Sequence, residues 1–268
     1  MKTKAVMKHV IMAALCLGAV NAYSAAAERP APKKWTVMIY INAVNDLELD
    51  AWKEVKEMEQ VGSDENVNIV VEFARRAYSL SNDGTWSGSR RYLIEKSDNP
   101  KTITSPVLAS FPEADMGDVA HARDFAAWAV KNYPAKKYAF ILWGHGTGFW
   151  DMNKKRAKGL SYDYGSGNYI TTIELGRLIA DINKMLGGKL DIYSSNACLM
   201  QMMEVAYEIK DGAKYIIGSE QTEPASGYDY VEVLSSLESA PGMDALALSR
   251  IIVDSFRAAY KGTDTTAK

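Results

Sequence analysis

Cysteine and histidine are scarce in this 268-residue chain, which contains two cysteines and three histidines. A zinc site normally needs several closely spaced residues of these types, and the sequence holds no such group. Cys16 and His9 lie in an N-terminal segment that we expect to be removed, which leaves Cys198, His121 and His145. A single thiol forms no intrachain disulfide, so Cys198 is buried and inert, paired between chains, or kept for its reactivity.

Long apolar runs are missing as well, and the one short run lies near the N-terminus. Basic residues precede the run from Val10 to Val20, and three alanines at 25–27 follow it. This layout is typical of a secretory signal with a small-residue cleavage site, and the run is shorter than the roughly 20 residues that span a bilayer. We therefore expect residues 1–27 to be a signal peptide, residues 28–34 to be a short linker, and the mature protein to be secreted or periplasmic.

A strong charge of either sign is also absent, because the formal net charge is only -2 at pH 7. This balance gives no electrostatic basis for binding nucleic acid or, after signal removal, an anionic membrane. The sequence has no phosphate-binding loop with a lysine and no serine in a Gly-x-Ser-x-Gly turn. The glycine-rich segment 144–148 superficially resembles a dinucleotide-binding loop, but no helical pattern opens after it.

Strand and helix patterns alternate along the rest of the chain. Apolar strand patterns lie at residues 35–41, 67–74, 138–143, 190–196 and 215–218, with a weaker, antiparallel edge strand expected at 91–96. Helical patterns lie at residues 46–61, 118–132, 171–186, 198–210, 228–237 and 244–260. This rhythm predicts an α/β fold, a three-layer sandwich of a mainly parallel sheet with helices on both faces.

Two of the expected strands end in residues that suit a cysteine hydrolase. His145 follows the strand that ends at Trp143, and Cys198 follows the strand that runs to Asn196. Parallel strands deliver the residues at their carboxyl ends to the crevice where open α/β sheets bind ligands. Cys198 is expected in the first turn of a helix, where the helix dipole favours the nucleophilic thiolate. The alternative is that Cys198 is a small packing residue.

The two remaining histidines are interpreted differently. His145 has glycines on both sides, which lets a substrate backbone approach and lets the Gly146 amide face a developing oxyanion. A structural histidine is the alternative at this position. His121 shares a predicted helix face with two aromatic residues, and such a stripe is more often packing, so we interpret His121 as structural.

Four collinear blocks of sequence between about Trp35 and Tyr230 resemble the clostripain family of cysteine peptidases. The blocks are Trp35-Thr-Val-Met-Ile-Tyr with Asn45-Asp-Leu-Glu48, Trp143-Gly-His-Gly-x-Gly, Ala197-Cys-Leu-Met-x-Met-x-Glu-Val-Ala-Tyr-Glu208, and Ser219-Glu-x-Thr-Glu-Pro224. The resemblance implies a caspase-like fold in which residues 35–268 form a single peptidase domain. It also implies a secreted endopeptidase that acts on a peptide or protein substrate, and we expect a monomer.

The resemblance assigns roles to the residues at the strand ends. Cys198 attacks the scissile carbonyl, His145 passes a proton to the leaving amine, and the backbone amides of Gly146 and Cys198 form the oxyanion hole. This chemistry requires no cofactor. Calcium is associated with the type member of the family and stays an open alternative, although no carboxylate loop of the EF-hand type occurs here.

The preference of the family for the residue before the cleaved bond is carried over to this chain less directly. Its members typically cleave after Arg or Lys, with an acidic residue in the pocket two positions before the nucleophile, where this chain has Asn196. An amide accepts a hydrogen bond from a basic side chain but adds no charge. Glu220 and Glu223 supply carboxylates after the next strand, unless both are solvated loop charges. A hydrolase of non-basic specificity and a catalytically silent caspase-like binding module are the alternatives.

A basic segment between the two catalytic motifs adds a hypothesis on maturation. The segment contains Lys154, Lys155, Arg156 and Lys158. Many relatives are zymogens that cleave themselves after a basic residue in a comparable loop, whereas the alternative is a solvated run of charge. Family members also commonly continue beyond the point where this chain ends, so we expect either a short variant or a truncated product.

Overall fold

The computed structural model describes residues 31–76, 83–149 and 159–262, and within these ranges the chain forms one seven-stranded sheet of order β4-β3-β2-β1-β5-β6-β7. The strands are β1 (Lys33–Ala43), β2 (Val67–Arg75), β3 (Gly88–Leu93), β4 (Val107–Phe111), β5 (Ala135–Trp143), β6 (Leu190–Asn196) and β7 (Ala213–Ile217). β2, β1, β5, β6 and β7 are parallel, whereas β3 and β4 are antiparallel to their neighbours. The predicted signal peptide lies outside the described residues, and β1 includes the last two residues of the predicted linker.

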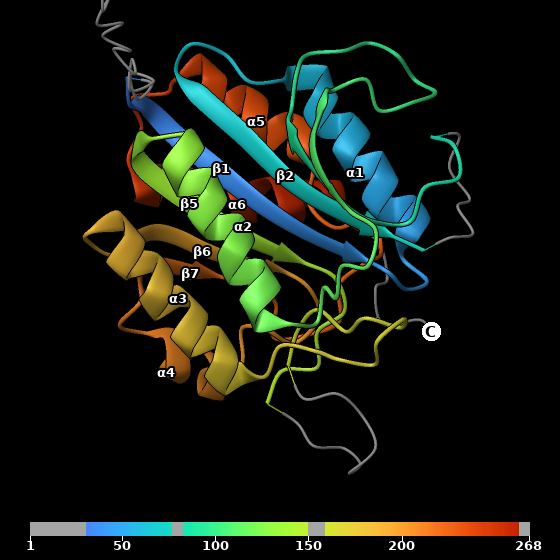
Figure 1. The fold of residues 1–268 in the computed structure, drawn as a ribbon. Helices are drawn as coiled ribbons and strands as arrows, with labels where there is room; N and C mark the ends of the chain where they lie inside the picture. Colours follow the sequence, from blue (N-terminus) through green and yellow to red (C-terminus); the bar gives the residue numbers. More distant parts are fainter. Residues whose placement is uncertain (1–30, 77–82, 150–158, 263–268) are drawn as a thin grey trace, which may run out of the picture.

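Different helices cover the two faces of the sheet (Figure 1). The helices are α1 (Glu48–Val61), α2 (Val119–Asn132), α3 (Thr172–Leu186), α4 (Met203–Ile209), α5 (Tyr230–Ser239) and α6 (Ala245–Ala259). Val37 and Ile39 of β1 pack in the core with α1, α5 and α6, while Met38 and Tyr40 pack in the core with α2, α3 and α4. Because successive side chains of a strand point to opposite faces, a strand buried on both sides is apolar throughout. The arrangement confirms the predicted α/β sandwich.

Local signals in the sequence set the starts of two helices as expected. The Asp118 side chain accepts a hydrogen bond from the Ala120 amide at the start of α2. Thr171 and Glu174 form a capping box at the start of α3, in which each side chain accepts a hydrogen bond from the other residue's backbone amide. Among the described residues, no helix is both long and apolar enough to cross a membrane.

The structure differs from the expected elements in three places. β3 begins at Gly88, three residues before the strand predicted at 91–96, and β4 takes the edge position instead. β4 gave little sequence signal because adjacent residues Val107 and Leu108 are both exposed, so its apolar residues do not alternate. The third difference lies in the segment after β6.

The helix predicted at 198–210 begins only at Met203. Leu199 has a φ of 63°, in the left-handed region, which no helical residue adopts. Its amide donates to the Gln221 carbonyl and the Gln201 amide donates to the Ser219 carbonyl, over 3.0 and 2.9 Å. Bonds to a distant segment therefore replace the first turn of the predicted helix.

Candidate active site

The parallel ends of β5 and β6 bring the two predicted catalytic motifs together. Trp143 and Asn196 are paired at the ends of these strands, and His145 and Cys198 each follow two residues later. The backbone of Gly146 then lies against the backbone of Cys198, because a Cβ placed on Gly146 would be 2.4 Å from the Cys198 carbonyl oxygen. The thiol and the imidazole therefore belong to neighbouring segments at one edge of the sheet, as predicted from the strand ends.

The tight fit of Gly146 leads to a prediction about stability. We expect Gly146→Ala to reduce the free energy of unfolding by about 1–3 kcal/mol, because the added methyl would overlap Cys198 and lie 2.8 Å from Met200 Cγ. Denaturant unfolding measures the loss. Gly242→Ala is the matched control, because nothing lies within 4 Å of a Cβ at that position. Equal unfolding midpoints for the two variants would contradict the close contact.

Cys198 lies in the turn between β6 and α4, and it is partly buried. Its Sγ accepts a hydrogen bond from the Glu223 amide over 3.2 Å. Burial raises the pKa of the Cys198 thiol above its usual value; the Glu223 amide opposes this rise and the Glu223 charge adds to it. The expectation that a helix dipole favours the thiolate is wrong, since α4 begins five residues later. A thiol in this setting needs a neighbouring base to become a nucleophile.

His145 has an acidic partner that the sequence reasoning did not assign. Its Nε2 lies 2.6 Å from Oδ1 of Asp46, and its ring stacks on Tyr164 with an interplanar angle of 9°. Burial by itself would raise the pKa of Asp46, but hydrogen bonds with His145 and Tyr164 and the charge of His145 hold it below its usual value. The imidazole is thus held between a carboxylate and an aromatic ring.

Asp46 comes from the connection between β1 and α1. The helix predicted at 46–61 starts two residues later than expected, since α1 begins at Glu48, without a side-chain cap. Asn45 instead accepts a hydrogen bond from the Leu47 amide and closes the turn. β1 and β5 are neighbours in the sheet, so this turn lies beside His145. Asp46 could have been identified from the sequence, because it lies in the Asn45–Glu48 block directly after an apolar strand.

His121 lies in a separate polar cluster under α2. Its Nε2 is 2.5 Å from Oε1 of Glu72, a buried carboxylate that also accepts hydrogen bonds from Ser89 and Arg91. These contacts agree with the structural interpretation of His121. We expect His121→Ala to lower stability by about 1–3 kcal/mol, because it removes a partner of a buried charge. Peptide turnover should stay at the wild-type level; a loss of turnover in a fully folded variant would contradict this role.

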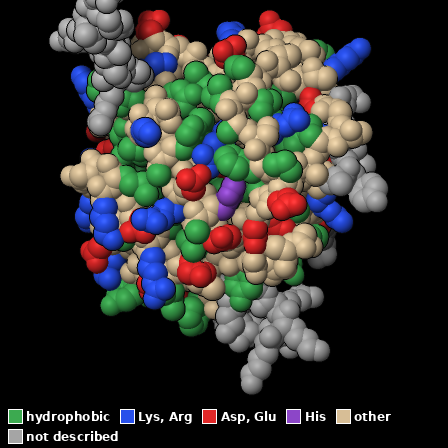
Figure 2. Space-filling model, viewed as in Figure 1, with side chains coloured by type: hydrophobic (Ala, Val, Ile, Leu, Met, Phe, Trp, Pro, Cys, Tyr) green, Lys and Arg blue, Asp and Glu red, His purple; other side chains and the backbone are tan. Residues whose placement is uncertain are grey.

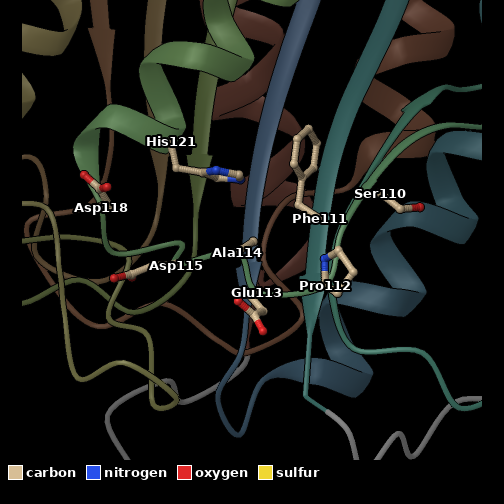
Figure 3. Close-up of a pocket in the computed structure, with 8 residues that line it drawn as sticks. All are labelled: Ser110, Phe111, Pro112, Glu113, Ala114, Asp115, Asp118 and His121. Atoms are coloured by element: carbon tan, nitrogen blue, oxygen red, sulfur yellow. The ribbon is translucent and has the colours of Figure 1, made fainter.

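A hollow of about 570 Å³ opens beside His121 (Figure 3). Its lining residues are Ser110, Phe111, Pro112, Glu113, Ala114, Asp115, Asp118 and His121. Acidic side chains also gather around a histidine in the middle of the face shown in Figure 2. Neither Cys198 nor His145 lines this hollow, and Nε2 of His121 is taken by Glu72, so the hollow is not the catalytic centre.

The predicted pocket residues have different surroundings. Glu220 is exposed, which agrees with a solvated loop charge, whereas Glu223 lies against the Cys198 sulfur. Asn196 is buried, and its Nδ2 donates to Oε2 of Glu54 on α1 over 3.2 Å. The predicted processing residues Lys154, Lys155, Arg156 and Lys158 lie outside the described residues.

Metal ligands are not grouped in the part of the chain that the structure describes. Within it, no three His, Cys, Asp or Glu side chains converge as the ligands of an ion would. The optional calcium ion stays a prediction.

Together, the parallel sheet, the Cys198 and His145 segments at its edge, and the Asp46 contact define the class of cysteine peptidases with an α/β fold. Residues 39–267 match the sequence model of the Clostripain family. The chain belongs to the clostripain family of cysteine peptidases. Clostripain of Hathewaya histolytica is 26% identical over 229 residues, which cover 78% of this chain and 43% of the relative.

Two solved structures show the same fold. A secreted cysteine protease from Bacteroides thetaiotaomicron, in complex with an irreversible peptide inhibitor, has a TM-score of 0.67 at 23% identity, over 85% of this chain and 59% of that one. An inactive zymogen protease from Parabacteroides distasonis has a TM-score of 0.66 at 21% identity, over 87% of this chain and 60% of that one. The chain therefore spans less than two thirds of the length of these relatives.

Proposed function

We propose that this protein is a secreted cysteine endopeptidase with a Cys198/His145 dyad. The observation that carries the proposal is the meeting of the two segments at the ends of β5 and β6, with Gly146 against Cys198. His145 takes the thiol proton, and Sγ attacks the scissile carbonyl carbon. The tetrahedral intermediate then expels the amine, which receives the proton from His145. Water hydrolyses the resulting thioester and restores the thiol.

Asp46 gives His145 a defined orientation in this mechanism. Because Nε2 faces the Asp46 carboxylate, Nδ1 is the ring nitrogen left to exchange a proton with the thiol and the leaving amine. The carboxylate also stabilises the imidazolium that forms after the thiol proton is taken. Asp46 is thus a positioning residue that acts through His145.

The backbone amides of Gly146 and Cys198 are proposed to bind the oxyanion. Support comes from the contact between the two backbones, which puts both residues next to the reacting sulfur. Amides that are fixed before the reaction stabilise developing charge without reorganisation.

We further propose cleavage after Arg or Lys, and maturation by self-cleavage between Lys154 and Lys158 after removal of the signal peptide at 1–27. The support for a basic preference is Glu223, whose backbone amide contacts the Cys198 sulfur and whose charge raises the pKa of the thiol. The support for maturation is that one structural relative is described as an inactive zymogen. Glu220 drops out of the pocket because it is exposed.

A peptide panel that varies the residue before the cleaved bond tests these proposals, with the mass of the protein followed in parallel. Cleavage after Arg and Lys, with a mass loss that maps to residues 154–158, is the expected result. Cleavage only after neutral or acidic residues would reject the basic preference. An unchanged mass in an active preparation would reject self-processing, and no cleavage of any peptide would favour the silent binding module.

A further inference from the structure

Two buried carboxyl groups lie near the nucleophile, and each has an oxygen without a hydrogen-bond partner. Glu54 on α1 is 1% exposed, and its Oε1 is unpartnered while Oε2 accepts from Asn196. Oε2 of Glu223 is likewise buried and unpartnered. An unpaired buried carboxylate costs several kcal/mol, so its presence in a folded protein calls for an explanation.

Both residues are linked to the nucleophile, Glu223 through its backbone amide and Glu54 through Asn196. The Glu223 amide donates to the Cys198 sulfur, and Asn196 stands two residues before the nucleophile at the end of β6. Gly227 closes over the other side, because a Cβ there would lie 2.1 Å from Oε1 of Glu54 and 2.8 Å from both amide atoms of Asn196. The unpartnered Oε1 of Glu54 therefore lies close to Asn196 and Gly227. It is on the side of the nucleophile that residues 219–227 cover.

The raised pKa values of these two carboxyl groups agree with a site that binds a cation. Burial raises the pKa of Glu54 well above its usual value; a hydrogen bond with the Trp143 side chain opposes this rise, and the charges of Glu57, Glu223 and Asp50 add to it. Burial also raises the pKa of Glu223 to about 8. Burial thus disfavours the ionised forms of both carboxyl groups, and a guanidinium or ammonium nearby would favour those forms and lower both pKa values.

A purely structural role accounts poorly for the acid at position 54. Anchoring Asn196 to α1 needs only one hydrogen-bond acceptor, which the amide of a glutamine also supplies. A glutamate adds the cost of burying an ionisable group and leaves one oxygen unpaired. The feature that a glutamine lacks is negative charge.

We propose that Glu54 supplies, from α1, the negative charge of the pocket that takes a cationic side chain before the cleaved bond, because Asn196 at the strand end carries none. Glu223 is the second acid of this pocket. Glu54 acts behind Asn196, whose amide it orients, so it is a residue that determines specificity rather than a catalytic residue. This inference rests on the proposed peptidase function.

Two variants of the full chain test the role of Glu54. Glu54→Gln keeps an acceptor for Asn196 and removes the charge, so we expect the ratio of kcat/KM for arginine over norleucine peptides to fall about 10- to 100-fold. The double variant Glu54→Gln with Asn196→Asp exchanges the two groups and keeps one carboxylate and one amide in contact. We expect this double variant to recover at least half of the decrease in the logarithm of the kcat/KM ratio.

Glu65→Gln is the control, because this acid is exposed and lies in the connection between α1 and β2. Its ratio should stay within about twofold of wild type. Thermal unfolding of each variant shows whether the fold is kept. An unchanged ratio in folded Glu54→Gln, or an exchanged variant that folds without recovering the ratio, would overturn the proposal.

A binding measurement separates failure of this inference from failure of the peptidase function. Benzamidine, a small cation with an amidine group, should raise the melting temperature of the Cys198→Ala protein more than it raises that of Cys198→Ala with Glu54→Gln. If the wild type cleaves no peptide but this difference is seen, the pocket stands and the peptidase function falls. Equal shifts in the two proteins would overturn the pocket.

Discussion

Cys198→Ala should abolish peptide hydrolysis, with kcat/KM reduced by about 10⁴-fold or more, because the thiol is the atom that bonds to the substrate. Cys198 is the one cysteine outside the predicted signal peptide at 1–27, so we expect no other thiol to replace it. The variant should fold, since alanine keeps the small side chain and loses only the contact between Sγ and the Glu223 amide. Initial rates on the best peptide of the panel, together with the mass of the protein, measure both effects.

Two controls make this result interpretable. Wild-type protein alkylated with iodoacetamide should be as inactive as Cys198→Ala, and one equivalent of label should suffice. His145→Ala should lose activity while keeping the thiol, because it removes the base that activates a sulfur whose pKa is raised by burial. Turnover by Cys198→Ala equal to that of wild type would remove the peptidase proposal altogether.

Asp46→Ala should reduce kcat by about 10²–10⁴-fold with KM nearly unchanged, because the carboxylate acts on the orientation and charge of His145 and not on substrate binding. Asp46→Asn should recover part of the loss, since its Oδ1 still accepts a hydrogen bond from Nε2 but brings no charge. A steady-state comparison of kcat and KM for the two variants measures the effect.

Asp50→Ala is the matched control for Asp46. Asp50 lies in the first turn of α1 and pairs with Lys53, so its loss should leave kcat within about twofold of wild type. If Asp46→Ala raised KM as strongly as it lowered kcat, or if Asp46→Asn were no better than Asp46→Ala, the positioning role would be wrong.

The sequence was sufficient for the parts of the site that depend on the ends of strands. β5 and β6 are apolar runs that end in His145 and Cys198, and parallel strands that are neighbours place their ends together. The capping box of α3 was equally readable, because its two residues lie three positions apart. The capping box needs no knowledge of the sheet order, whereas the meeting of the two motifs also requires β5 and β6 to be neighbours.

Other parts depend on contacts between distant segments. Asp46 reaches His145 only because β1 lies next to β5, although four strands and two helices separate the two residues along the chain. Glu54 meets Asn196 because the face of α1 extends to the end of β6. The turn at Leu199 replaces a helix because its amide bonds to Gln221. No periodicity in the sequence specifies these pairings.

The two backbone bonds that join residues 199–201 to residues 219–221 couple the nucleophile to the acid beside it. The Leu199 amide bonds the Gln221 carbonyl, and the Gln201 amide bonds the Ser219 carbonyl, on one side of the Cys198–Glu223 contact. Hydrogen bonds thus tie the backbone on both sides of the reactive sulfur to the segment that carries Glu223. We expect a substrate side chain that displaces residues 219–223 to displace the thiol as well, so that recognition of this side chain also affects the alignment of the attacking sulfur.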